Sequence, residues 1–228
     1  MNRKKMNDSE KIDKMINELR IHLTDKVEHF QYSMIAKIPL KVHSFIEVMN
    51  LRMLDFSEAA QLLLKQDKVV PAIPLIRSLF ENVANTNSVI KAVELSLSTN
   101  KLTNDFDDLI TKIEFGTRYS DDIVSTNILT QIDKLDKQFK GVREFYDTLC
   151  EFTHPNWDGV EGSYSELDEV NHCTYIQKVI TKEHPMISFF QACFLFIISI
   201  FSGSAEWLRN NLQKFSELCE ADIKRNLK

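Results

Sequence analysis

The residues best suited to chemistry lie on the segment that ends at His154. Ionisable and thiol side chains recur there at helical spacing, at Arg143, Asp147, Cys150, Glu151 and His154, so one helix would carry them as a single stripe. A histidine titrates near neutral pH, and the C-terminal end of a helix stabilises its cationic form. The stripe therefore predicts either the wall of a polar pocket or a face in contact with water.

A second polar pair lies on an earlier segment, where Arg77 and Glu81 are four residues apart. Arg77 borders an apolar stripe, and a charged side chain in that position usually has a partner. The spacing allows a local ion pair with Glu81, and it also allows Arg77 to reach a carboxylate near the helix end at His154. In the second case we predict one connected polar cluster, made up of Arg77, Glu81, Glu151, His154 and Asn156.

The spacing Glu151-x-x-His154 also occurs in di-iron helical bundles, which need two copies of it. The chain has no second copy, and its four cysteines form no CxxC pair of the zinc-ribbon kind. It contains no glycine-rich phosphate loop and no GxSxG elbow. We therefore expect no metal and no cofactor, while a single-ion site at Glu151 and His154 stays open.

The segment from Gly141 to Val170 is strongly acidic. It holds eight carboxylates and one basic residue, Arg143, which gives a net charge of −7, against −5 for the whole chain. Such a field repels phosphate groups and attracts cations or basic proteins. The chain as a whole lacks the basic footprint that a nucleic-acid-binding domain usually has. The acidic surface between Glu144 and Glu169 thus predicts contact with a basic protein partner.

The elements that must position these groups are predicted to be helices. The 228 residues include only five Gly and five Pro, which favours an all-α protein over an all-β one. We predict a single domain over residues 1–228, a helical bundle of about six helices. Residues 1–40 would hold the N-terminal helix, and residues 155–185 a loop with a small β-hairpin insertion before the last helix.

Apolar residues at helical spacing set the expected boundaries. The predicted helices cover about 9–37, 42–66, 71–97, 102–116, 141–154 and the stretch from 186 to 220 or beyond. Residues 121–140 are polar and have no sharp boundaries. The hairpin would pair 163–167 with 171–180 across Asp168–Val170, because polar and apolar residues alternate on both sides.

The run from Met186 to Ser202 is almost wholly apolar. Its length is at the lower limit for a membrane span, and no cluster of Lys or Arg flanks it. A helix that is apolar on all sides also suits the centre of a bundle. We predict a buried central helix and no membrane contact, with a membrane span as the alternative. The charged start of the chain and its unpaired cysteines predict a cytoplasmic protein.

Two strings resemble a known family, Arg77-Ser-Leu-Phe-Glu-Asn82 and Glu151-Phe-Thr-His-Pro-Asn156. On the basis of these two strings, residues 42–207 resemble uncharacterised bacterial all-helical domains that are related to the HEPN-like superfamily of helical bundles. The resemblance implies a bacterial protein that forms homodimers and takes part in a defence or toxin-type system linked to RNA. Many HEPN domains are metal-independent ribonucleases, and others are not catalytic.

The usual HEPN motif is an Arg, four to six residues, and then a His on one helix. Here Arg143 precedes His154 by eleven positions, so only the residue types match. If the chain cleaves RNA, the resemblance implies that His154 is the general acid or base and that an Arg stabilises the charge at phosphorus. The alternative is a non-catalytic module that binds proteins through its acidic surface. The candidate catalytic residues are His154, Arg77, Glu81, Glu151, Asn156 and Arg143.

Overall fold

The computed structural model describes residues 6–103, 106–117 and 123–227. These residues contain eight α-helices, one π-helical turn and one β-hairpin. In chain order the elements are α1 (Asp8–Ile21), α2 (Ile38–Lys65), α3 (Val69–Thr99), α4 (Phe106–Phe115), α5 (Ile128–Gln138), α6 (Val142–Thr153), η1 (Trp157–Glu161), α7 (Gly162–Tyr164), β1 (Ser165–Asp168), β2 (Cys173–Ile176) and α8 (Ile187–Asn226).

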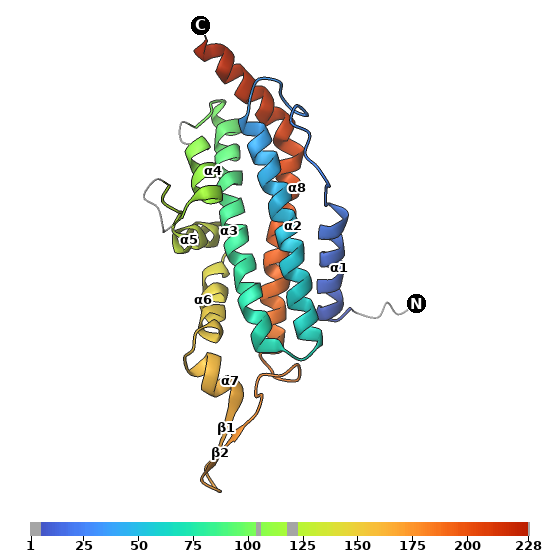
Figure 1. The fold of residues 1–228 in the computed structure, drawn as a ribbon, viewed down its shortest axis with the longest axis vertical. Helices are drawn as coiled ribbons and strands as arrows, with labels where there is room; N and C mark the ends of the chain where they lie inside the picture. The colour runs from blue at the N-terminus through green and yellow to red at the C-terminus, as the bar shows by residue number, and fades with distance from the viewer. Residues whose placement is uncertain (1–5, 104–105, 118–122, 228) are drawn as a thin grey trace.

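The long helices α1, α2, α3 and α8 form a bundle (Figure 1). Helix α3 has neighbours on both sides, because it packs against α2 and α8 and also against α5 and α6. The hairpin projects beyond one end of the bundle, below α6 and η1 in Figure 1. The prediction of a helical fold with a hairpin insertion before the last helix is therefore confirmed.

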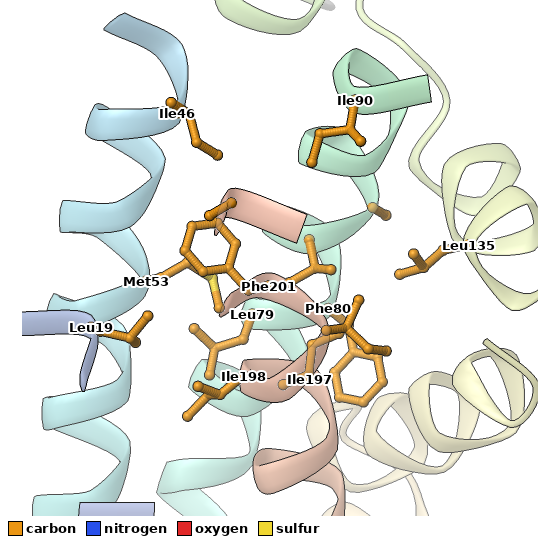
Figure 2. Packing of buried hydrophobic residues seen from close by; sticks show 14 of the residues in the cluster. Leu19, Ile46, Met53, Leu79, Phe80, Ile90, Leu135, Ile197, Ile198 and Phe201 are labelled. Atoms are coloured by element: carbon orange, nitrogen blue, oxygen red, sulfur yellow. The ribbon is translucent and has the colours of Figure 1, made fainter. Parts of the chain in front are cut away.

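The core lies between α2, α3 and α8. Met53, Leu79, Ile198 and Phe201 are each fully buried, and Figure 2 shows their side chains meeting between the three helices. Removing one such side chain from water contributes about 1.5–3 kcal/mol. The apolar residues that recur at helical spacing in the sequence are the ones that face this core.

The apolar helix α8 packs against α1, α2 and α3, as expected of a central helix. It is not buried on all sides, however, because small side chains at Ser188, Ala192, Ser199 and Gly203 are exposed. In the described part of the chain, α8 is the one helix long and apolar enough to cross a membrane, and 39% of its most apolar 18-residue window is buried. The expected lack of membrane contact stays a prediction.

The N-terminal helix is shorter than predicted. The prediction of a helix over 9–37 is wrong, because α1 ends at Ile21 and a loop follows up to α2. A side chain in that loop bonds its backbone N–H groups. Ser33 Oγ accepts hydrogen bonds from the N–H groups of Ile35 and Ala36 at 3.1 and 2.8 Å. A loop whose backbone is bonded in this way does not continue the helix. Pro39 lies in the first turn of α2, where proline is tolerated.

The other helices lie close to their predicted ranges. Helices α2, α3, α6 and α8 match to within a few residues. Helix α4 occupies part of 102–116, and α5 occupies residues 128–138 of the polar stretch. The start of that stretch at Asp121 lies outside the described residues.

The predicted hairpin is confirmed, with a turn over residues 169–172 instead of 168–170. Strands β1 and β2 pair antiparallel, with Glu166 opposite Tyr175 and Leu167 opposite Thr174. The Asp168 carboxylate accepts from the backbone N–H groups of Val170 and Asn171 at 3.0 and 2.9 Å, an arrangement typical of an Asx turn. The Asn171 side-chain amide also donates to this carboxylate at 2.7 Å. This bond, together with those from the backbone, lowers the pKa of Asp168 and fixes the turn.

Two of the four thiols are expected to be inert in the folded protein. Cys193 and Cys219 are buried, and burial raises the pKa of each thiol to about 12. Cys173 is half-exposed on the hairpin. Because the thiolate is the reactive form, we expect a disulfide reagent at pH 8 to modify Cys173 first and to leave Cys193 and Cys219 unmodified until the protein unfolds. Cys173→Ser should remove the fast phase. Rapid modification of all four thiols in the native protein would contradict this packing.

Candidate functional site

Arg77 ties helix α3 to helix α6. Its Nη2 donates to Glu81 Oε1 at 2.8 Å and to the Tyr146 hydroxyl at 3.0 Å, and its Nε donates to Cys150 Sγ at 3.2 Å. The Tyr146 hydroxyl in turn donates to Glu81 Oε1 at 2.8 Å. Arg77 thus reaches the helix that ends at His154, but the predicted carboxylate partner on that helix, and with it the single cluster of Arg77, Glu81, Glu151, His154 and Asn156, is wrong. Its partners there are Tyr146 and Cys150.

The electrostatics of this cluster favour a structural tie. Burial raises the pKa of Tyr146, and the neighbouring Glu81 carboxylate raises it further, so the hydroxyl stays a proton donor. Burial opposes the charge of Arg77, but the bonds to Tyr146 and Glu81 outweigh that cost and raise the pKa of its guanidinium. Arg77 and Glu81 keep only 27% and 28% of their side-chain surface exposed. The cluster is therefore a satisfied polar network, in which each group has its partner.

His154 does not join this cluster. It is the exposed C-terminal cap of α6, with an extended backbone. Within the described ranges, no hydrogen bond or ion pair connects its imidazole to Arg77, Glu81 or Glu151. The end of the helix explains the separation: Tyr146 and Cys150 face α3, whereas α6 ends at Thr153 and the extended backbone of His154 leaves the helical path.

Glu151 and Asn156 form a second, local group. Asn156 Nδ2 donates to Glu151 Oε2 at 2.5 Å, and Asn156 Oδ1 accepts from the N–H of Gly159 at 3.1 Å. A Cβ at Gly159 would lie 2.0 Å from the carbonyl oxygen of His154, so only glycine fits there. These contacts show that residues 151–156, together with Gly159, form a tight turn at the end of α6.

Arg143 is engaged on the outer side of α6. Its Nε donates to both carboxylate oxygens of Asp147 at 2.9 and 2.8 Å, and its Nη1 donates to Asp133 at 2.7 Å. The two carboxylates raise the pKa of the guanidinium. Contact between Arg143 and a phosphate would have to disrupt these pairs.

Sequence reasoning missed the residue that caps α6. The Asp136 carboxylate accepts from the backbone N–H groups of Gly141 and Arg143 at 3.0 and 3.2 Å, and these bonds lower its pKa. It thereby satisfies N–H groups that the first turn of a helix leaves free. An Asp shortly before Gly141 was the available signal. In the part of the chain that the structure describes, no three His, Cys, Asp or Glu side chains gather as metal ligands.

The acidic surface carries exposed apolar side chains, which sequence reasoning also missed. Around the hairpin, Leu167 is 65% exposed, Ile176 84% and Val170 86%. The carboxylates of Glu166 and Glu169 lie on the same hairpin and are exposed. Apolar side chains this exposed, among charged ones, are typical of an interaction surface. The alternation of polar and apolar residues in the sequence indicated an apolar face on the hairpin, but not that this face is uncovered.

Comparisons with protein-family models, curated proteins and solved structures gave no match. The expected HEPN-like relationship therefore stays a prediction.

Proposed function

We propose that the protein is a non-catalytic interaction module whose hairpin arm binds a basic segment of a protein partner. The hairpin arm comprises residues 161–177, which include α7, β1 and β2. The observation behind this proposal is that the arm projects from the bundle (Figure 1) and carries carboxylates and exposed apolar side chains together.

The isolation of the arm supports a binding role. Strands β1 and β2 form a sheet of two strands, and the neighbouring element that contacts β1 is the short η1. A two-stranded hairpin gains little stability by itself in water. A partner that binds the projecting hairpin would cover its exposed apolar side chains and stabilise it.

The charge of the arm supports a basic partner. Glu161, Glu166 and Glu169 are exposed on it, and Lys178 follows it. The segment 141–170 has a net charge of −7, which attracts a basic surface and repels the phosphates of RNA.

Three of the candidate catalytic residues are held by partners within the chain, which supports the same proposal. Arg77 and Arg143 are bound by side chains of this chain, and Asn156 holds a turn. The RNA-directed defence role, the homodimer and the cytoplasmic location stay predictions.

Neutralising the arm should weaken binding of a lysine decapeptide by about tenfold at about 0.1 M salt. The variant Glu166→Gln/Glu169→Gln removes two exposed charges, each contributing up to about 1 kcal/mol. The control Glu206→Gln/Glu217→Gln removes two exposed charges on α8 and gives the same net charge. It should bind as the unchanged protein does in isothermal titration calorimetry.

Two results would overturn the proposal. Equal losses in the arm variant and in the α8 control would show attraction by net charge alone. Cleavage of total RNA by the unchanged protein, abolished by His154→Ala, would establish the ribonuclease alternative.

A further inference from the structure

The outer edge of β2 is open. Within the described ranges, β2 pairs with β1 and with no other strand. The N–H of Gln177 donates to the carbonyl of Tyr164, one register step beyond the ladder. Bonding and non-bonding pairs alternate in an antiparallel ladder, so Cys173 and Tyr175 turn their backbone groups toward β1. The N–H and C=O groups of Thr174 and Ile176 therefore point outward.

The two edges of the hairpin differ in composition. Strand β1 reads Ser-Glu-Leu-Asp and holds two carboxylates, whereas β2 reads Cys-Thr-Tyr-Ile and holds no charge. Charged residues protect an edge from pairing, and Thr, Tyr and Ile favour strands. Of the two edges of this hairpin, the edge of β2 is therefore the one at which a further strand can add.

The two faces of the hairpin differ as well. Residues directly opposite each other share a face, so Glu166 and Tyr175 lie on one side with Asp168. A shallow hollow near the tip of the hairpin is lined by Glu166, Asp168 and Tyr175 together with Leu167 and Val170. Leu167 and Ile176 lie on the other side and are 65% and 84% exposed. One face is therefore acidic and the other apolar.

We propose that the edge of β2 takes up an extended partner segment in which basic and apolar residues alternate. This inference rests on the function proposed above and names the partner's chemistry. The segment would bond its backbone to Thr174 and Ile176 as a third strand. Because side chains alternate between faces along a strand, its basic residues would lie beside Tyr175, on the same face as Glu166. Its apolar residues would lie beside Ile176, on the same face as Leu167.

Two heptapeptides test this arrangement against the full-length protein. One alternates Lys and Val, and the other groups the same four Lys and three Val in two blocks. By titration calorimetry, the alternating peptide should bind about tenfold more tightly, because only its sequence places every Lys on the acidic face and every Val on the apolar face of one added strand. Thr174→Pro removes an outward N–H and spares the bonds to β1, so it should bind both peptides equally. Thr174→Val should keep the preference.

A second measurement needs no variant of the protein. An alternating peptide N-methylated at its three central amides should bind the unchanged protein as weakly as the block peptide. Equal binding of the alternating and block peptides would overturn strand addition and leave the basic-partner function intact. Binding of neither peptide would overturn both. A dimer that Thr174→Pro abolishes would show that a second copy of this chain occupies the edge, which would also overturn the inference.

Discussion

Replacing Arg77 with alanine should lower the free energy of unfolding by about 2–3 kcal/mol. The substitution removes the donor that joins Glu81, Tyr146 and Cys150. It leaves the Glu81 carboxylate, 28% exposed, without its cation. Loss of one partner from a buried pair costs about 3–5 kcal/mol, and the remaining exposure reduces this figure. Urea unfolding, followed by fluorescence of Trp157 and Trp207, measures the change.

Arg143→Ala is the matched control, because Arg143 also binds two acidic side chains but lies at the surface, with 39% of its side chain exposed. Its loss should cost about 1 kcal/mol or less. Tyr146→Phe, which removes only the hydroxyl, should cost about 1 kcal/mol. If Arg77→Ala changes stability by no more than about 0.5 kcal/mol, Arg77 makes only a local pair with Glu81.

Replacing Phe201 with alanine should destabilise the protein by about 3–5 kcal/mol, the usual range for a phenylalanine lost from a core. Phe201 is fully buried on α8 and faces Met53 and Leu79 (Figure 2). Phe115→Ala is the same change at a side chain that is 65% exposed, and should cost about 0.5 kcal/mol or less. Both changes in stability are measured as shifts in the midpoint of denaturant unfolding, provided that the dependence of the free energy of unfolding on denaturant concentration stays the same. Similar effects of the two variants would contradict the placement of α8 in the core.

The long helices could be predicted from the sequence because each has an apolar stripe over several turns. The N-terminal helix could not be bounded in this way, since Leu23 and Val27 continue its apolar spacing after α1 has ended at Ile21. Its end depends on distant contacts: Ser216 donates to the carbonyl of Tyr32 at 2.8 Å, and Ser33 donates to Glu220 at 2.7 Å. Bonds between residues so far apart in the chain leave no local pattern.

The candidate site was predictable in part. The position of Arg77 at the edge of an apolar stripe indicated that it reaches α6, but not which residues it meets there. The rotation of α6 about its axis turns Tyr146 and Cys150 toward Arg77 and Glu151 away from it. The end of the helix at Thr153 leaves His154 outside the cluster. The exposure of Leu167 and Ile176 depended on the hairpin standing away from the bundle, and strand alternation alone does not show whether a face is covered.

Hydrogen–deuterium exchange tests the central claim, that the hairpin arm is the binding surface. Exchange is compared for the unchanged protein with and without the alternating Lys–Val heptapeptide. We predict slower exchange in residues 165–177, strongest at Thr174 and Ile176, whose N–H groups face away from β1. Unchanged exchange there, with protection instead around Arg77, Tyr146 and His154, would contradict the account.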